Sequence, residues 1–330
     1  MIISEITKNS KSISKIVNNV ISIENYSVDK LALWNQFVDE SKNGTFMLNR
    51  GFIEYHSDRF VDYSLMIYDN NKLAALLPAS KHGNELRSHG GLTYGGFVIG
   101  RKMTAQLMLC VMESVKSFLK AKGFKTLTYK RIPYIYYDYP SDEDLYALFR
   151  VGAQLTRRDI STSIFLRDRI RFNERRRRNV KKAIKANLTF RQSDDFCQYI
   201  DILAEVLSSR HNTKPVHTAD EIKLLAERFP ENIKLYASYD GDKMLAGSII
   251  FETPRVAHSQ YIASSPAGRN CGALDFCFDK LINDIYSNKE YFDFGISTED
   301  RGLFLNEGLV EQKQEFGGRG VIYEEYTLKI

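Results

Sequence analysis

The 330-residue sequence lacks the features of several protein classes. Its 7 prolines and 20 glycines are too few for a collagen-like or low-complexity chain. No apolar run approaches the ~20 residues that cross a bilayer, and the first residues hold no apolar core of a secretory signal. The four cysteines form no CxxC pair and the six histidines no HExxH or HxxxH pattern, so we expect no metal site. Few cysteines without a signal predict a cytoplasmic location, where thiols stay reduced.

What the sequence contains is typical of a globular protein. Hydrophobic residues make up 43% and charged residues 26%, with 20 phenylalanines, 19 tyrosines and a single tryptophan available to fill a core. The length fits one or two domains of ordinary size. The formal net charge of +5 is mild, although its distribution along the chain is uneven.

An internal repeat gives the clearest indication of the architecture. The segment 68–74 resembles the segment 239–246: in each, an alternating apolar run meets a two-residue polar turn and a second apolar run follows, which predicts a β-hairpin. The elements around both hairpins follow in the same order, at an offset of roughly 165–170 residues. Strands and helices in this order predict an α+β fold, layered as in α/β proteins, with helices on both faces of a sheet. The predicted domains are 1–165 and 166–330.

Helix caps and apolar periodicity place the remaining elements. In the first half we expect helices from Ser27 and around 51–60, then a strand over 91–98 and a long helix. After the long helix we expect a strand over 126–130, a helix over 142–151 and a strand over 161–166. The apolar face of the helix from Ser27 holds Val28, Leu31, Trp34 and Val38, and that of the long helix holds Leu107, Val111, Val115 and Phe118. In the second half we expect helices from Ser193 and Thr218, a strand over 256–263, a long helix with Leu274, Phe278, Leu281 and Ile285 on one face, a strand over 291–294, a helix over 305–316 and a strand over 321–328.

The positive charge is concentrated in the segment 167–185, between the two halves. This segment holds ten basic and two acidic residues, a net charge of +8. We expect a helix over 173–187 that docks through its apolar residues while the arginines project. One interpretation is a solvated charged face. The other is an arm that binds the phosphates of a nucleotide, a cofactor or RNA, because four consecutive arginines outnumber the local carboxylates and the arginine fork suits phosphate. Its candidate ligand-binding residues are Arg175 and Arg178.

A glycine-containing turn, 264–273, connects a predicted strand that carries His258 and Tyr261 to the long helix of the second half. A helix start exposes unpaired N–H groups and a partial positive charge, and glycines let a phosphate approach them. The turn is therefore a candidate pyrophosphate cradle, although glycine and serine also occur in turns for conformational reasons alone. No GxxxxGK or GxGxxG motif is present. The candidate cofactor-binding residues are Ser264, Arg269, Asn270, Cys271, Gly272 and Ala273; a nucleophilic role for Cys271 is disfavoured because no paired histidine is visible.

Three further stretches carry a resemblance to a known family. They are Arg178-Asn179-Val180-Lys181-Lys182-Ala183, Tyr291-Phe292-Asp293-Phe294-Gly295, and Asn306-Glu307-Gly308-Leu309 followed by Gln312-Lys313-Gln314-Glu315-Phe316-Gly317-Gly318. Together with the duplicated element order, they resemble the tandem, FemAB-like branch of the GNAT superfamily of N-acyltransferases. The first looks like the basic helix that opens that branch's second fold, the second like its fifth strand, and the third like its closing helix with a lysine ahead of Phe-Gly.

The resemblance implies two tandem GNAT-like folds, each a mixed, mostly antiparallel sheet flanked by helices, with the acceptor side in 1–165 and the acyl-donor loop in 166–330. It implies acyl transfer from acyl-CoA, as co-substrate, to an amine such as an amino sugar or a cell-envelope precursor. The alternatives are a FemAB-type transferase that uses aminoacyl-tRNA and a peptidoglycan precursor, and a non-enzymatic nucleotide- or RNA-binding protein. The expected partners are a small-molecule amine or a nucleotide-sugar acceptor, with tRNA as the alternative donor; no metal is implied, and the oligomeric state stays open.

The sequence departs from the family pattern in two places. The family's donor loop reads Arg/Gln-x-x-Gly-x-Gly/Ala, which Arg269 and Gly272 match and Leu274 does not. In the first half, the glycine-rich stretch 90–96 has no arginine at what we take to be the corresponding place. We therefore expect the first fold to be non-catalytic and to help hold the acceptor.

Acyl transfer to an amine needs a base, support for the tetrahedral oxyanion and a stabilised leaving group. The resemblance assigns oxyanion or leaving-group support to Lys313, which would otherwise be an exposed helical lysine. His258 and Asp293 are candidate bases, with a packed strand histidine and a turn cap as the alternatives. The tyrosine candidates are Tyr261 as the acid for a departing thiolate, and Tyr94 and Tyr136 as contacts to the acceptor. The aromatic run 131–137 either packs inside or offers its rings to a sugar or the acceptor.

Overall fold

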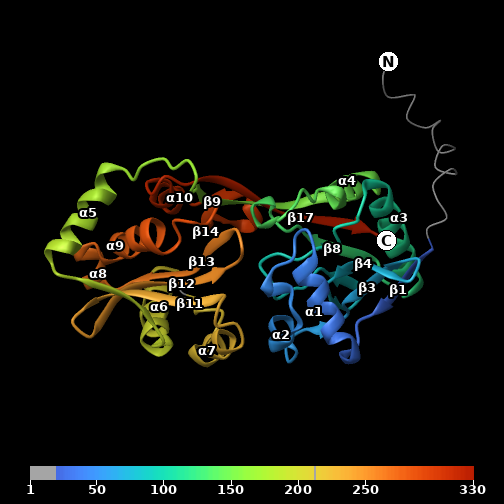
Figure 1. Ribbon diagram of the computed structural model, residues 1–330, viewed down its shortest axis with the longest axis horizontal. Helices are drawn as coiled ribbons and strands as arrows, with labels where there is room; N and C mark the ends of the chain where they lie inside the picture. The colour runs from blue at the N-terminus through green and yellow to red at the C-terminus, as the bar shows by residue number, and fades with distance from the viewer. Residues whose placement is uncertain (1–19, 212) are drawn as a thin grey trace, which may run out of the picture.

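The computed structural model describes residues 20–211 and 213–330 and shows two lobes bridged along one side by two long strands (Figure 1). The first lobe contains β1 (Ile21–Asn25), α1 (Leu31–Glu40), α2 (Arg50–Ile53), β2 (Val61–Asp62), β3 (Leu65–Asp69), β4 (Lys72–Leu77), β5 (Ser80–His82), β6 (Glu85–Arg87), β7 (Val98–Ile99), α3 (Ala105–Ala121), β8 (Thr126–Lys130) and α4 (Glu143–Arg150). The second lobe contains α5 (Glu174–Lys185), β10 (Thr189–Ser193), α6 (Phe196–His211), α7 (Ala219–Arg228), β11 (Ile233–Asp240), β12 (Lys243–Glu252), β13 (Val256–Ser264), α8 (Pro266–Cys271), α9 (Ala273–Lys280), β14 (Tyr291–Ile296), β15 (Thr298–Glu299), β16 (Phe304–Leu305) and α10 (Glu307–Gln314). The bridging strands are β9 (Gln154–Phe165) and β17 (Arg319–Lys329).

The predicted α+β class and the repeat are confirmed. Both hairpins form, and each turn has the positive φ angles that a two-residue connection requires: 47° at Asn70 and 63° at Asn71 in the first, and 58° at Gly241 in the second. In the described part of the chain, one sheet has the order β1-β3-β4-β7 and the larger one β10-β11-β12-β13-β14-β9-β17-β8-β6-β5-β2. Pairing is antiparallel except for β13 with β14 and β6 with β8.

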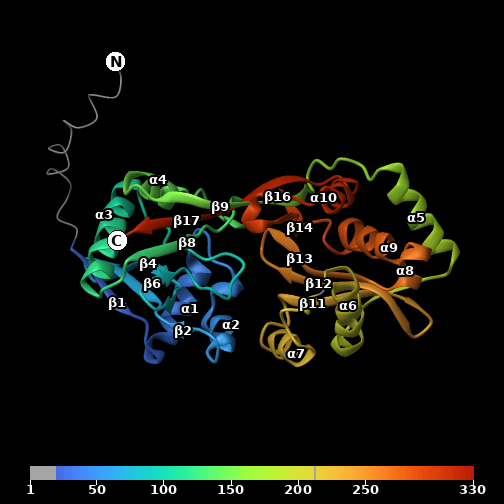
Figure 2. The same cartoon turned by 180° about the vertical axis from the view of Figure 1, so that it is seen from behind.

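The two halves of the chain exchange their last strands. β9 ends the first half, yet its residue Phe165 pairs with Tyr291 of β14 in the second lobe. β17 ends the second half, yet it runs back beside β8, where Lys329 pairs with Thr126. Figures 1 and 2 both show the C-terminus in the first lobe, beside α3. The larger sheet is therefore continuous through both lobes, and each lobe is completed by a strand from the other half.

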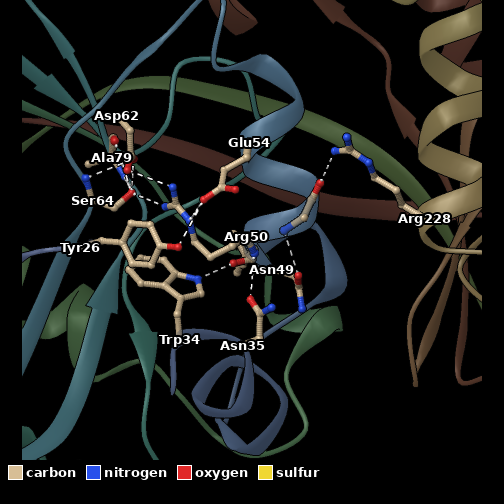
Figure 3. Close-up of polar contacts among 12 residues, drawn as sticks. Tyr26, Trp34, Asn35, Asn49, Arg50, Glu54, Asp62, Ser64, Ala79 and Arg228 are labelled. Carbon is tan, nitrogen blue, oxygen red and sulfur yellow. Dashed lines mark hydrogen bonds and ion pairs between the residues drawn. The ribbon is translucent and has the colours of Figure 1, made fainter. Parts of the chain in front are cut away.

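A hydrophobic interface also joins the lobes. Phe46 of the first lobe contacts Phe251 of the second, with ring centroids 5.6 Å apart, and both belong to one buried cluster. Figure 3 shows the polar anchor behind this interface, the side chain of Arg50, which is 2% exposed and ion-paired with Glu54 and Asp62, each at 3.0 Å. Arg228 of α7 donates to the backbone carbonyl of the neighbouring residue 51 at 3.0 Å. The apolar contact and the Arg228 hydrogen bond join the lobes, while the ion pairs of Arg50 hold the first-lobe side of this interface in place.

Several local predictions were wrong. The expected strand over 91–98 is mostly loop, because strand structure begins only at Val98. Val28 and Leu31 are 76% and 37% exposed, since the chain enters α1 through a 3₁₀ turn that rotates them away from the core. Strands β1 and β10 were not predicted, because each is a short edge strand with mixed polarity. The helix from Thr218 was predicted well: its threonine and Glu221 form a complete capping box.

Candidate active site

The site lies where β13 and β14 part. These parallel strands pair only as far as His258 with Asp293. Beyond that pair, β13 continues to Ser264, while β14 bends at Gly295, which has a φ of 76°. The opening between the strands adjoins two pockets that share Phe294 as a lining residue.

The first of these, the central pocket, lies between the two halves and has a volume of about 410 Å³. Its lining comes from both halves and is rich in charged side chains. The first half contributes Lys130, Arg131, Arg157 and Asp159, and the second contributes His258, Gln260, Tyr323, Glu324 and Glu325. A mixed lining of this kind suits a polar ligand that carries its own charges.

The second, the outer pocket, has a volume of about 710 Å³ and lies among α5, β13 and α10. Its lining is largely apolar, with Leu203, Ile262 and Phe278 among the contributors. Arg175, Arg269 and Lys313 also line it. The pocket can therefore hold an extended, partly apolar group with a negatively charged end.

His258 and Asp293 form a buried hydrogen-bonded pair on the floor of the opening. His258 Nδ1 lies 2.7 Å from Asp293 Oδ2, and the carboxylate is 0% exposed. Ser161 and Ser163 of β9 donate to Asp293 Oδ1 at 2.6 and 2.5 Å, and Tyr323 donates to Oδ2 at 3.1 Å. Burial alone would raise the pKa of Asp293, but the hydrogen bonds and charge of His258 and the two serine hydroxyls outweigh it and hold that pKa below its usual value.

An ionised Asp293 determines the state of the histidine ring. With Nδ1–H donated to the carboxylate, Nε2 is the basic nitrogen of neutral His258. His258 is among the residues that line the central pocket. The ring also packs closely under the bend in β14, since a Cβ built on Gly295 would lie 3.5 Å from His258 Cε1. This arrangement is that of a general base held by a carboxylate.

Lys313 stands at the wall between the two pockets. It is 5% exposed, and its Nζ donates to the carbonyl oxygens of Gly295 at 2.8 Å and Ile296 at 2.7 Å. Gly295 and Ile296 line the central pocket, while Lys313 lines the outer pocket. Burial lowers the pKa of Lys313 to about 8, against the opposing charge of Asp293. An ammonium has three N–H donors, so one is left to bind a developing oxyanion.

The predicted donor loop divides into a part that faces the outer pocket and a part that does not. Ser264 and Arg269 line the pocket, whereas Asn270 is exposed outside its lining. Gly272 faces helix α5: a Cβ there would lie 2.4 Å from the carbonyl oxygen of Asn179. Ala273 is 0% exposed and Cys271 packs in the same cluster with α5. Residues 271–273 therefore form a packing surface for α5, in place of the open cradle that was expected.

Several other backbone amides of this loop already have partners. Pro266 has no N–H group, the Gly268 amide donates to Ser265 Oγ at 3.1 Å, and the Arg269 amide to the Ser265 carbonyl at 2.9 Å. At the start of α9, Asp275 accepts a hydrogen bond from Arg176 at 2.9 Å. Asp275 thus places a negative charge in the first turn of α9, which disfavours a phosphate at this helix start.

The basic side chains of helix α5 differ between its two sides. Those on the inner side, toward α9 and α10, are ion-paired, and most of those on the outer, exposed side are not. Arg176 is 8% exposed and ion-pairs with Asp275 and Glu315, and exposed Arg175 also pairs with Glu315, at 2.5 Å. Arg177 pairs with Glu174 at 2.7 Å. The basic side chains of α5 without an ion-pair partner among the described residues are all exposed: Arg178, Lys181, Lys182 and Lys185. Three of the four consecutive arginines find carboxylates and Arg178 does not, which agrees with the expectation that they cannot all be paired locally. The remaining unpaired charge lies further along the helix.

The tyrosine candidates lie in the core or away from the opening. The hydroxyl of Tyr261 faces His217, whose other ring nitrogen faces Tyr55. Tyr94 is 1% exposed and donates to Thr45 Oγ1 at 3.1 Å. Tyr136 is 3% exposed, and its hydroxyl lies 3.1 Å from that of Tyr323. None of the three is among the lining residues of the two pockets.

Tyr323, Ser161 and Ser163 were missed by sequence reasoning. All three contact Asp293 from the exchanged strands β9 and β17. The only signal was the spacing of the two serines, which places both hydroxyls on one face of a strand. No sequence pattern pairs them with a strand 130 residues away.

The corresponding opening in the first lobe is closed. Tyr129 of β8 fills it: its hydroxyl accepts from the Phe97 amide at 2.8 Å and donates to Asp144 at 2.5 Å. Gly96 is needed beside it, because a Cβ there would lie 2.7 Å from the ring. The loop that matches the donor loop is 100–104, between β7 and α3, and it contains Arg101. The stretch 90–96 was therefore the wrong segment to compare with the donor loop. The first lobe differs from the second because Tyr129 fills the opening between its strands.

Comparisons with known proteins agree with this architecture. Residues 167–300 match the family model of the acetyltransferase (GNAT) domain. A structure of FemX has a TM-score of 0.66 at 11% identity, covering 94% of this chain and 97% of that one. The structure of L-PGS from Bacillus licheniformis has a TM-score of 0.59 at 14% identity, covering 92% of each chain. A tandem GNAT protein from the clavulanic acid biosynthesis pathway has a TM-score of 0.50 at 9% identity, covering 94% and 98%. The search of curated proteins found no match.

The family match assigns residues 167–300 to the acetyltransferase (GNAT) domain. The solved structures show that the chain as a whole has the tandem GNAT-like fold seen in FemX and in the tandem GNAT protein. Within residues 20–211 and 213–330, no group of three or more His, Cys, Asp or Glu side chains is placed to hold a metal ion. None of the helices in the same residues is long and apolar enough to span a membrane.

Proposed function

We propose that the protein is an N-acyltransferase in which the acyl donor occupies the outer pocket and the acceptor amine occupies the central pocket. The observation that carries this proposal is the junction of the two pockets at the β13–β14 opening. His258 serves one side of that junction and Lys313 the other. A base and an oxyanion donor on opposite sides of one opening are what transfer of an acyl group to an amine requires.

The residues support a balanced reaction sequence. The amine nitrogen attacks the acyl carbon, and His258 Nε2 takes the proton that the nitrogen loses. The third N–H of Lys313 binds the oxyanion of the tetrahedral intermediate. The C–O or C–S bond to the leaving group then breaks, and the proton on His258 passes to the departing oxygen or sulfur. Asp293 stabilises the imidazolium that exists between the two proton transfers.

Tyr323, Ser161 and Ser163 act as positioning residues in this scheme. They keep Asp293 ionised and oriented, so that His258 presents Nε2 to the acceptor. Because these residues lie on β9 and β17, the base is assembled only when both exchanged strands are in place. Tyr323 lines the central pocket, whereas the hydroxyl of Tyr261 faces His217. Of the two tyrosines, Tyr323 is therefore the better placed to support the base.

The donor is either acyl-CoA or aminoacyl-tRNA, and two observations favour the tRNA. The Gly268 and Arg269 amides, which could otherwise hold a pyrophosphate, are already bonded, which weakens the case for CoA. The unpaired basic residues lie on the exposed side of α5, the same helix whose Arg175, Arg176 and Asn179 line the outer pocket, and a row of such charges suits a donor with many phosphates. A purely nucleotide- or RNA-binding protein would have no use for a buried His258–Asp293 pair at the junction of two pockets.

The test is an acyl-transfer assay with purified protein. Labelled acetyl-CoA and a labelled aminoacyl-tRNA pool are each offered with glucosamine and with a panel of small amines, and amide products are measured by mass spectrometry. We expect amide formation from one donor class. His258→Gln and Asp293→Asn should each lower the rate by about 10³-fold or more, while His82→Gln, a partly buried histidine of β5, should leave it unchanged. Absence of amide with every donor, or a full rate in His258→Gln, would refute the proposal.

A further inference from the structure

A third pocket lies near the central pocket and contains none of the residues that we propose for the chemistry of transfer. It has a volume of about 670 Å³ and lies on the surface where the two halves meet. Tyr134, Tyr137 and Tyr139 contribute to it from the loop after β8, and Arg255 and Glu290 contribute from the second half. We call it the tyrosine pocket. Arg131 separates the two pockets: it lines the central one, and it is ion-paired with Asp142, which lines the tyrosine pocket.

The tyrosine pocket presents exposed aromatic rings. Tyr134 is 49% exposed and Tyr139 is 58% exposed. The aromatic surface continues across the boundary between the halves, because Tyr134 meets Tyr291 edge to face at 6.4 Å and Tyr291 contacts Phe165 at 5.4 Å. Phe165 is itself 41% exposed. A continuous exposed aromatic surface beside polar groups is characteristic of a binding site.

The backbone that carries these rings is fixed in place. The amides of Asp138 and Tyr139 both donate to the carbonyl of Lys42, at 2.9 and 3.3 Å. Lys42 is 2% exposed and its ammonium is ion-paired with Glu143 of α4. A ligand that binds here therefore does not have to order the loop, which reduces the entropic cost of binding.

One buried hydroxyl at this pocket lacks a partner. Ser141 lines the pocket and is 1% exposed, yet its Oγ makes no hydrogen bond among the described residues. Buried polar groups are nearly always hydrogen-bonded, so this hydroxyl at the pocket wall is open to a partner from a water or a ligand. The hydroxyl both donates and accepts, which suits another hydroxyl.

We propose that the tyrosine pocket binds a saccharide unit. The apolar C–H face of a pyranose packs on a tyrosine ring, and its hydroxyls pair with Ser141 and with the carboxylates of Asp138 and Asp142. A nucleic acid is disfavoured, because those carboxylates repel phosphate and Glu290 already pairs with both arginines of the pocket, Arg255 at 2.7 Å and Arg167 at 3.7 Å. This inference extends the proposed function: beside the central pocket, the saccharide would be the part of the acceptor that lies beyond the reacting amine.

Binding can be tested on the full-length protein without any acyl donor. Triacetylchitotriose, maltotriose and a ten-nucleotide single-stranded RNA are titrated by calorimetry, and ligand contacts are mapped by saturation-transfer NMR. We expect one of the two trisaccharides to bind. Tyr134→Ala and Tyr139→Ala should each weaken that binding about tenfold or more, and Ser141→Ala should weaken it several-fold. The matched control is Tyr146→Ala, another exposed tyrosine, 46% exposed on α4, which should bind as the wild type does.

The outcomes separate this inference from the proposed function. Because the saccharide is held by the tyrosine pocket, His258→Gln should abolish transfer and leave saccharide binding unchanged. The inference is overturned if neither trisaccharide binds, or if the Tyr134 and Tyr146 variants bind equally well. Either result counts against it even if amide formation is observed. RNA binding that is lost in Tyr134→Ala would also overturn it, since the rings would then stack on bases.

Discussion

The buried ammonium of Lys313 lowers the stability of the fold at the position where we propose that it binds the oxyanion. Its ammonium is buried against β14, and its pKa falls from 10.5 to about 8 because burial disfavours the charge. The folded protein therefore holds this proton less tightly than the unfolded chain does. The resulting cost to folding is about 3 kcal/mol; it is fully present below pH 8 and disappears as the pH rises to 10.5.

We predict that Lys313→Met is more stable than the wild type and nearly inactive. At pH 7 the relief of the buried charge exceeds the loss of two hydrogen bonds by about 1 kcal/mol, which raises Tm by about 2 °C. Differential scanning calorimetry at several pH values checks the sign, because the gain should shrink between pH 8 and pH 10. In the wild type, kcat should fall as the pH rises through about 8, because the oxyanion then loses its ammonium donor. A destabilised Lys313→Met protein, or one with a normal rate, would show that the amine is merely structural.

For the individual residues of the site, the sequence indicated the residue types but not their contacts. His258 and Asp293 were candidates separately, and only the parallel register of β13 and β14 makes them partners. Tyr94 and Tyr136 could not be told from surface tyrosines, because an aromatic run after a strand looks the same whether it packs inward or outward. Neighbouring Tyr134 does face outward.

Helix α5 is the element whose two sides have different roles. Its inner arginines hold α9 and α10 in place through Asp275 and Glu315, while its outer charges have no partner among the described residues. Arg175 belongs to the inner set, so reversing its charge would disturb the fold near Glu315. Arg178 and Lys181 have no ion-pair partner among the described residues, so charge reversal at these two positions tests anion binding without breaking an ion pair of the fold.

We predict that Arg178→Glu combined with Lys181→Glu weakens binding of tRNA about tenfold or more and lowers the slope of log K against log salt by about 2. Filter binding across a range of salt concentrations measures both quantities. The matched control is Lys120→Glu with Lys122→Glu, two exposed lysines at the end of α3 in the other lobe. If the α5 variant and the control bind equally, the basic face of α5 is only solvated.

The sequence predicted α5 well and the donor loop poorly, for one physical reason. The Asn173 cap and the apolar residues of α5 are local signals, and the helix begins at Glu174 with that cap in place. The closure of residues 271–273 depends on a contact between Gly272 and Asn179, which are far apart in the chain. The glycine that seemed to admit a phosphate in fact admits the backbone of another helix.

For the whole molecule, the exchange of β9 and β17 makes the two lobes dependent on each other. β8 would be an unpaired edge without β17, and β14 would be one without β9. Exposed edges of this kind favour aggregation. The repeat in the sequence predicted two similar folds, but a repeat cannot show which copy of the last strand joins which sheet, since both copies have the same pattern.

We predict that the fragments 1–165 and 166–330 are each unstable alone and form a stable complex when produced together. Each fragment lacks the strand that completes its sheet, and the second also lacks Ser161 and Ser163 beside Asp293. Size-exclusion chromatography and circular dichroism of the separate and co-expressed fragments check this. A soluble fragment that unfolds cooperatively by itself would contradict the role given to the exchanged strands.

The central claim is that donor and acceptor meet at the β13–β14 opening. The most direct measurement is a crystal structure with a non-reactive analogue of the donor, either an acyl-CoA thioether or an aminoacyl-adenosine amide. We predict that its chain lies in the outer pocket, with the acyl oxygen within about 3 Å of Lys313 Nζ and the acyl carbon facing His258. A donor analogue bound elsewhere, or one whose acyl group points away from Lys313, would contradict the account.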